Sequence, residues 1–280
     1  MMKVGIIGAG TMGTGIAQTF ACAGGYSVVL CDATAEQAER GRAKVAAALD
    51  KLVQREKIGA EAAKQAVAVI AVGTADSVAD CDLVIEAAVE DMKVKRELFA
   101  VLDRACKRDA IFVTNTSSLS IKEIGAGLGR PVIGMHFFNP VPVMKLVEIV
   151  APSGAPQDLV DKVRDVAVSI GKTPVAVKDN AGFIVNRLLI PFVNEAIGVL
   201  AEGTAEAADI DTAMKLGANH PMGPLELADL IGLDVCLAIM EDLHSRLGDE
   251  RYLAHPLLRE MVAKGKLGRK SGGGFYGSNS

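Results

Sequence analysis

The stretch Lys3-Val-Gly-Ile-Ile-Gly-Ala-Gly-Thr-Met-Gly13 decides the fold of this chain. Its short apolar start predicts a buried strand over 3–7, and a helix is expected to follow the glycine turn and run to about residue 22. Gly8, Gly10 and Gly13 have the spacing G-x-G-x-x-G. In this arrangement the first glycine permits a tight turn, the second lets the backbone approach a pyrophosphate, and the third lets helix and strand pack closely.

An acidic residue stands where a dinucleotide site requires one. A second strand is expected over 26–31, and Asp32 follows it, 19 residues after Gly13. A carboxylate there accepts hydrogen bonds from the ribose hydroxyls of NAD and repels the 2′-phosphate of NADP, and Ala33 brings no cation beside it. NAD is therefore the expected cofactor. Asp32 also suits the N-cap of the next helix, and the two roles are compatible. The residues of this motif assigned to NAD are Gly8, Gly10, Thr11, Met12, Gly13 and Asp32.

The rest of the chain divides into two regions. In the first, further strands are predicted over 68–72, 82–87, 110–114, 131–135, 145–150 and 173–177. Helices are predicted there over 35–57, 61–68, 93–106, 120–127 and 157–170. This alternation predicts an α/β fold with a Rossmann-type, doubly wound, mostly parallel sheet. After Phe183 only helices are expected, near 184–202, 206–217, 224–230, 233–247 and 255–264. The expected domains are an NAD-binding domain with an inserted helical pair, 1–183, and an all-helical C-terminal domain, 184–280.

Composition argues against several functional classes. The net charge of −4 disfavours nucleic acid as the main partner. No stretch reaches the ~18 apolar residues of a membrane helix, and the first apolar run is too short and too broken by glycine for a signal peptide. The five cysteines form no CxxC pair and no metal-ligand spacing. Such thiols are typical of a reduced, cytoplasmic protein without a metal centre.

Two polar segments after buried strands carry candidate catalytic groups. Asn115-Thr-Ser-Ser118 follows the strand 110–114, at an edge of the sheet where ligands bind. His136 lies in Gly-Met-His-Phe-Phe-Asn-Pro, 134–140, and Glu148 follows twelve residues later. Histidine can take and give a proton near neutral pH, and a carboxylate on the next strand would fix its tautomer. The structural alternatives are a capped turn at Ser118 or Ser120 and a buried strand histidine.

Taken together, these motifs closely resemble the 3-hydroxyacyl-CoA dehydrogenase family, and in particular its short-chain bacterial 3-hydroxybutyryl-CoA members. The resemblance spans essentially the whole chain. Its most specific segments are His-Phe-Phe-Asn-Pro, 136–140, and Gly-Phe-Ile-Val-Asn-Arg, 182–187. The other matching segments are 8–13, 85–91, 115–121, 209–217, 221–224 and 268–276.

The resemblance implies reversible NAD-linked oxidation of an (S)-3-hydroxyacyl-CoA to the 3-oxoacyl-CoA, by a homodimer whose subunits meet through the helical domain. His136 would be the base for oxidation and the acid for reduction, with Glu148 as the second member of the dyad. Ser117 and Asn186 would hydrogen-bond the substrate oxygens. For Lys95 and Lys270, which the resemblance assigns to the cofactor, the alternative is a solvated charge. For Glu90 the alternative is a helix-entry acid. The further cofactor contacts that the resemblance implies are Glu90, Lys95, Asn115, Asn139 and Lys270.

The helical pair expected to meet CoA departs from the family pattern. Relatives offer a serine and a lysine there, where this chain has Ala48 and Arg55. Arg55 keeps a positive charge for a phosphate, and Lys51 lies close to it in the sequence. Lys51 and Arg55 are therefore the candidate CoA-binding residues, with a solvated helix face as the alternative.

Two other functions remain open from the sequence. One keeps the fold but oxidises a free hydroxy acid, as do sugar-acid dehydrogenases related to lens crystallins. The other is a non-catalytic NAD-binding protein. The basic helical pair favours a phosphorylated, CoA-sized acyl substrate over the first. The intact set of Ser117, His136, Glu148 and Asn186 argues against the second.

Overall fold

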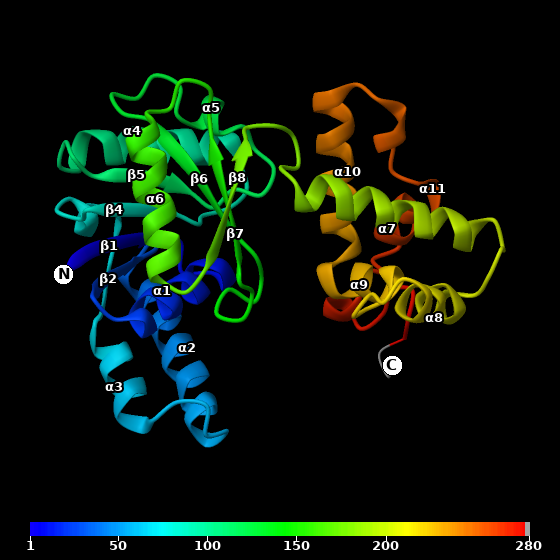
Figure 1. Ribbon diagram of the computed structural model, residues 1–280, viewed down its shortest axis with the longest axis horizontal. Helices are drawn as coiled ribbons and strands as arrows, with labels where there is room; N and C mark the ends of the chain where they lie inside the picture. The colour runs from blue at the N-terminus through cyan, green and yellow to red at the C-terminus, as the bar shows by residue number, and fades with distance from the viewer. Residues whose placement is uncertain (278–280) are drawn as a thin grey trace. The chain divides into compact units, whose positions relative to one another are not determined.

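The computed structural model describes residues 1–277, and the chain divides into two compact units. The first unit is Met1–Asp179 and the second is Asn180–Ser280 (Figure 1). The division lies just before the boundary expected at residue 183. Each unit has a hydrophobic core of its own. Across the described residues, every helix is too short or too polar to span a bilayer.

The first unit is built on an eight-stranded sheet in the order β3-β2-β1-β4-β5-β6-β7-β8. Neighbouring strands are parallel except for β6 and β7. The strand order reverses between β1 and β4, and such a switch opens a ligand crevice beyond the carboxyl ends of the strands. This confirms the predicted doubly wound fold. The strands are Met2–Ile7, Tyr26–Cys31, Ile70–Gly73, Leu83–Glu86, Ile111–Thr114, Val132–Phe137, Leu146–Ala151 and Thr173–Lys178, β1 to β8 in order.

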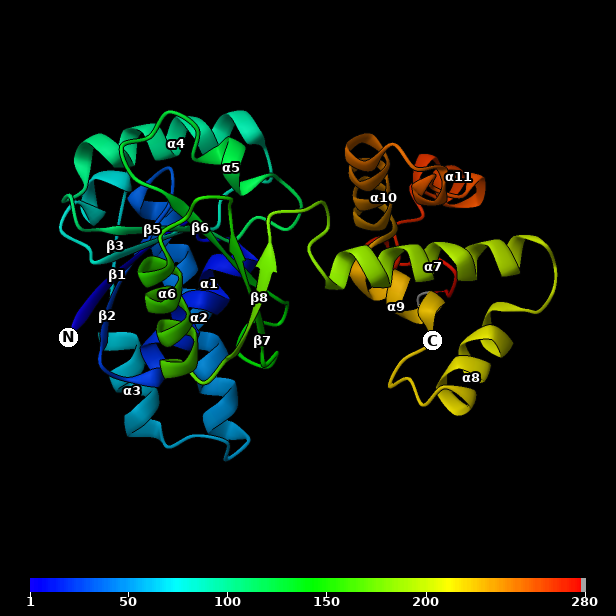
Figure 2. The same ribbon diagram turned by 45° about the horizontal axis from the view of Figure 1, so that its top comes forward.

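Helices cover both faces of this sheet, as Figure 2 shows, with α1 and α6 on one side and α4 and α5 on the other. The central strands β4 and β6 are consequently buried along their whole length. The pair α2 and α3 projects beyond the sheet (Figure 1). α5 is a single turn rather than the helix expected over 120–127, because Gly125, Gly127 and Gly129 follow it. The helices are Thr11–Ala23, Ala35–Gln54, Ala60–Ala68, Met92–Ala105, Ile121–Ile124 and Gln157–Ser169, α1 to α6 in order.

Within its described residues, the second unit consists of helices joined by loops, with isolated β-bridges near its end. Its core joins Ile197 of α7, Leu225 of α9, Met240 of α10 and Leu258 of α11, all of them fully buried. The C-terminal tail is bound to this core. Buried Asp229 of α9 accepts the backbone N–H groups of Phe275 and Tyr276 at 3.0 and 2.9 Å. The helices are Val185–Ala201, Ala207–Gly217, Pro224–Ile231, Leu233–Leu247 and Pro256–Ala263, α7 to α11 in order.

The three glycines of the first turn differ in backbone conformation and in the space available for a side chain. Gly8 has a φ of +108°, and a Cβ on Gly13 would lie 1.7 Å from the Gly8 carbonyl oxygen. A Cβ on Gly10 would meet nothing within 4 Å. Gly10 is the N-cap of α1, and the first turn of that helix carries no acidic residue. Its N–H groups can therefore receive an anion.

These differences predict separate effects for two alanine substitutions. Gly13→Ala should lower the free energy of unfolding by about 1–3 kcal/mol, because the helix must move away from the Gly8 turn. Gly10→Ala should leave stability unchanged but weaken NADH binding, because its methyl group would occupy space kept for the pyrophosphate. Thermal unfolding and fluorescence titration with NADH measure the two effects. Equal unfolding temperatures for both variants would contradict this division of roles.

Candidate active site

Asp32 lies at the end of β2, next to the glycine turn. Its Oδ2 accepts the N–H of Ala9 at 2.7 Å, and its Oδ1 accepts the N–H of Ala33 at 2.7 Å. The carboxylate is therefore fixed beside the turn that would hold a pyrophosphate. The N-cap alternative for Asp32 is wrong, because Thr34 caps α2 in a capping box with Gln37.

His136 and Glu148 face each other across two strands. They are direct cross-strand partners in the antiparallel pair β6 and β7. Nδ1 of His136 lies 2.7 Å from Oε2 of Glu148, and the two side chains are 7% and 1% exposed. The ring of Phe138 packs on the imidazole, with the ring centroids 4.5 Å apart. The pair therefore has a fixed distance and a shielded setting, and Nδ1 is the ring nitrogen that faces Glu148.

The segment after β5 is tied to the histidine strand. The side-chain oxygen of Asn115 accepts the N–H of Phe137 at 2.8 Å. The N–H of Asn115 itself donates to the carbonyl oxygen of Glu86, also at 2.8 Å. Asn115 therefore joins the ends of β4, β5 and β6, and it places the turn of Ser117 beside the strand of His136.

Glu90 holds that serine turn. Its Oε1 accepts the hydroxyl of Thr116 at 2.6 Å and the N–H of Ser117 at 2.8 Å. The hydroxyl of Ser117 also lies 3.2 Å from the same oxygen. Burial would raise the pKa of Glu90, but the charge of Lys95 and these hydrogen bonds outweigh it and hold the pKa below the usual value. Glu90 is not the helix-entry acid, because Asp91 caps α4.

A buried charge cluster lies behind Glu90. Lys95 is 1% exposed, so the solvated-charge alternative for it is wrong. Its Nζ lies 2.6 Å from Oε1 of Glu86 and 3.2 Å from Oε2 of Glu90. Glu86 is fully buried and also accepts the hydroxyl of Thr114 at 2.5 Å. The sequence interpretation missed Glu86 and Thr116. The signal for Glu86 was an acid at the end of the apolar run Leu-Val-Ile, where a parallel strand meets the crevice.

The other predicted residues are less closely grouped. Asn139 is exposed in the loop after β6. Two exposed cations lie at the end of α2: Lys51 in its last turn and Arg55 at its C-cap. Asn186 lies in the first turn of α7, and Nζ of Lys270 lies 2.5 Å from Oδ1 of Asp234 on α10. Asn186 and Lys270 belong to the second unit, so their part in the site of the first unit stays a prediction.

Comparison with known proteins agrees with this construction along the whole chain. Residues 3–180 match the model of the 3-hydroxyacyl-CoA dehydrogenase NAD binding domain, and residues 182–278 match that of the C-terminal domain of the same family. A 3-hydroxybutyryl-CoA dehydrogenase of Clostridioides difficile is 50% identical over 99% of this chain and 100% of its own length. The mitochondrial hydroxyacyl-coenzyme A dehydrogenase of Homo sapiens is 43% identical over 98% of this chain and 90% of its own length.

A solved structure extends the agreement to the fold. The crystal structure of (S)-3-hydroxybutyryl-CoA dehydrogenase from Ralstonia eutropha superimposes with a TM-score of 0.95 at 45% identity, covering 99% of each chain. Sequence identity of 45–50% over the full chain and the two matched domain models together assign the chain to one family. The chain belongs to the 3-hydroxyacyl-CoA dehydrogenase family, and its first unit is that family's NAD binding domain.

Proposed function

We propose that this protein catalyses the reversible NAD-dependent oxidation of (S)-3-hydroxybutyryl-CoA to acetoacetyl-CoA. The observation that carries the proposal is the shielded 2.7 Å contact between His136 and Glu148 in the unit that binds NAD. The relatives named as 3-hydroxybutyryl-CoA dehydrogenases support the substrate, and the name of the Ralstonia enzyme supports the (S) configuration.

The first unit has the features that NAD requires. The open position at Gly10 and the start of α1 suit the pyrophosphate, and the fixed carboxylate of Asp32 suits the ribose hydroxyls. NAD, when bound, supplies the acceptor for the hydride that leaves the hydroxyl-bearing carbon. Within this site we assign Glu90, Lys95 and Asn115 to the lining of the cofactor crevice. Asn139 is assigned to its nicotinamide end.

His136 handles the proton. With Nδ1–H donated to Glu148, Nε2 becomes the acceptor that takes the proton of the substrate hydroxyl during oxidation. In the reverse direction the imidazolium returns that proton to the carbonyl oxygen. Glu148 holds one tautomer and stabilises the charged ring, and its own burial strengthens the interaction.

Ser117 and Asn186 are assigned to the substrate oxygens. Ser117 suits this role because Glu90 orders its turn, and Asn115 ties that turn to the strand of His136. We assign the phosphates of CoA to Lys51 and Arg55, whose exposed cations lie at the end of α2. Lys270 is assigned to the cofactor, although within the second unit it pairs with Asp234.

A paired assay tests the proposed activity. Reduction of acetoacetyl-CoA should be fast with NADH, much slower with NADPH, and much slower with free acetoacetate. The repulsion of a 2′-phosphate by Asp32 predicts the cofactor preference, and the cations of α2 predict the preference for CoA. Initial rates at 340 nm give the catalytic efficiencies. Equal rates with free acetoacetate would favour a free hydroxy acid as the substrate, and no turnover at all would favour a non-catalytic NAD-binding protein.

The dyad predicts the effects of two substitutions. His136→Ala should lower kcat by about 10²–10⁴-fold while NADH still binds, since a positioned proton-transfer group contributes that much. Glu148→Gln should also lower kcat, because it removes the charge that stabilises the imidazolium. Glu97→Gln is the matched control, since Glu97 lies on α4 with its side chain 67% exposed. If Glu148→Gln leaves both kcat and its pH profile unchanged, the two groups are not coupled.

We further propose a homodimer whose subunits meet through the helical domain expected over 184–280, which lies within the second unit. Three leucines of this unit point their apolar side chains to solvent: Leu188 of α7 is 70% exposed, Leu216 of α8 82% and Leu230 of α9 50%. A contiguous patch of exposed apolar groups marks an association surface, and we propose that these leucines belong to one. A permanent interface of this class buries about 2,000 Å² or more, and one polar substitution at its centre disturbs it.

Light scattering on the full chain should therefore give about twice the subunit mass of 29.2 kDa. The combined substitutions Leu188→Glu and Leu216→Glu should shift the protein toward the monomer. Val168→Glu is the control, because Val168 of α6 is also an exposed apolar residue, at 59%, but lies in the first unit. A monomeric unaltered protein at micromolar concentration would contradict the assignment.

A further inference from the structure

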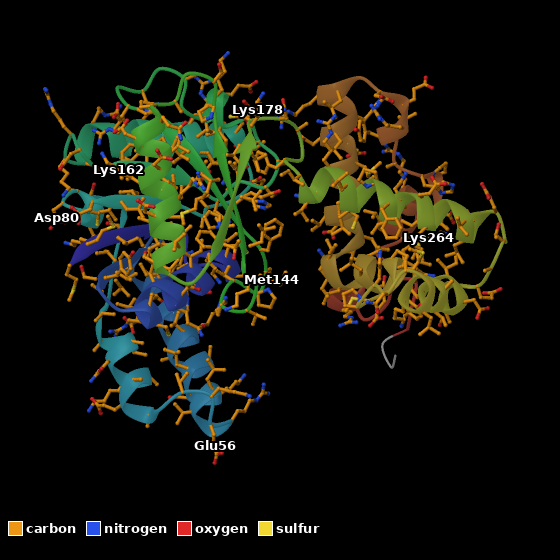
Figure 3. All side chains as sticks on the ribbon, viewed as in Figure 1. Glu56, Asp80, Met144, Lys162, Lys178 and Lys264 are labelled. Atoms are coloured by element: carbon orange, nitrogen blue, oxygen red, sulfur yellow. The ribbon has the colours of Figure 1, made fainter. Side chains whose placement is uncertain are left out.

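The loop 138–145 joins the two strands that carry His136 and Glu148. Inside the loop, the N–H groups of Val143 and Met144 both donate to the carbonyl oxygen of Pro140, at 2.9 and 3.0 Å. Figure 3 labels Met144 in this loop. The loop is therefore a compact turn, and its first residue, Phe138, packs on the imidazole of the dyad.

The same loop also contacts the cofactor helix. Val141 is 2% exposed, and a Cβ added to Gly15 of α1 would lie 2.9 Å from the Cβ of Val141. Gly15 thus leaves room for Val141 in the second turn of the helix whose start receives the pyrophosphate. Movement of the loop would change the spacing between the cofactor helix and the dyad strands.

A buried lysine that has no part in the chemistry proposed above holds this loop. Lys172 is 7% exposed, and its Nζ donates to the carbonyl oxygens of Val141 at 2.5 Å and of Met144 at 2.8 Å. Both acceptors are neutral main-chain groups. Burial, and to a smaller extent the nearby charge of Lys145, lower the pKa of Lys172 below the usual lysine value. An apolar side chain would avoid this desolvation, but it would leave the two carbonyls without these donors.

The backbone of Lys172 is itself rigidly placed. α6 ends in a Schellman motif, in which Lys172 N–H donates to the carbonyl oxygen of Ala167 at 3.0 Å and Gly171 N–H donates to that of Val168 at 2.9 Å. Gly171 has the positive φ of +73° that this motif needs. The next residue, Thr173, donates its N–H to Lys145 at 2.8 Å as β8 begins. The ammonium group therefore extends from a fixed point to a loop that has no regular secondary structure.

We propose that Lys172 is a positioning residue for the reaction: its ammonium group clamps the loop 138–145 and so sets Phe138 against His136 and Val141 against the cofactor helix. The position of the loop rests on the contacts above, and only the effect on turnover rests on the proposed function. A misplacement of about 1 Å near reacting groups lowers a rate by up to about 100-fold.

The variant Lys172→Met tests the clamp, because it keeps an unbranched side chain only one atom shorter and removes the three N–H donors. Lys162→Met is the matched control: Lys162 lies on α6, labelled in Figure 3, with its side chain 64% exposed. Hydrogen exchange measured by mass spectrometry should show faster exchange of the amides in 138–145 for Lys172→Met and an unchanged rate for Lys162→Met. Wild-type exchange of this segment in Lys172→Met would overturn the proposal.

Kinetics separate positioning from a general loss of structure. Lys172→Met should lower kcat for acetoacetyl-CoA by about 10- to 100-fold, while KM, the dissociation constant of NADH and the number of NADH sites per subunit stay unchanged. A proportional loss of sites and of kcat would indicate simple unfolding and would overturn the positioning role. If the unaltered protein does not reduce acetoacetyl-CoA, the proposed function fails, while hydrogen exchange still decides whether the clamp exists.

A measurement on the unaltered protein covers the case in which Lys172→Met does not fold. Brief treatment with acetic anhydride should acetylate Lys162 rapidly and leave Lys172 unmodified, because the latter is buried and hydrogen-bonded. Mass spectrometry of the digested protein reads both positions. Acetylation of Lys172 at the rate of Lys162 would overturn the proposal.

Discussion

The reversal of one strand is the constraint on which the site depends. β7 runs antiparallel to β6 inside a sheet whose other neighbours are parallel. In an antiparallel pair, residues directly opposite each other are held about 4.5–5.5 Å apart at Cα, and their side chains lie on the same face. His136 and Glu148 form such a pair. Their contact is consequently a property of backbone pairing rather than of two mobile side chains, and a shift of one residue would place them on opposite faces.

The buried charges next to the serine turn are also held by the ends of regular elements. Glu86 ends β4, and Lys95 comes from α4 to lie between Glu86 and Glu90. Two carboxylates share one ammonium group. The hydroxyl of Thr114 in β5 adds a donor to Glu86, and Thr116 and Ser117 of the turn add donors to Glu90. A buried charge without such partners costs several kcal/mol, so the turn and the cluster stabilise each other. The position of Ser117 therefore depends on Glu90 and, through Lys95, on the end of β4.

Sequence reasoning located the elements better than the contacts among them. The glycine spacing with Asp32, the alternation of strands and helices, and the family resemblance all rest on local patterns, and the fold class and the NAD binding domain are confirmed. Strand β6 was expected to end before His136 and in fact runs through Phe137. The reason is that its last residues pair with β7, and pairing is not local. Lys95 and Lys172 have no pattern that separates a buried lysine from a solvated one, since their partners come from distant or irregular segments.

The tail of the second unit shows how cooperativity arises from one carboxylate. Asp211 of α8 is 1% exposed; it accepts the N–H groups of Leu225 and Glu226 at the start of α9 and the hydroxyl of Tyr276 at 2.6 Å. Burial, followed by the Asp211 contact, raises the pKa of Tyr276, so the phenol stays protonated and remains a donor. Detachment of the tail would leave a buried carboxylate short of a donor. The two helices and the tail are thus expected to unfold as one unit, without a stable intermediate in which only the tail has come free.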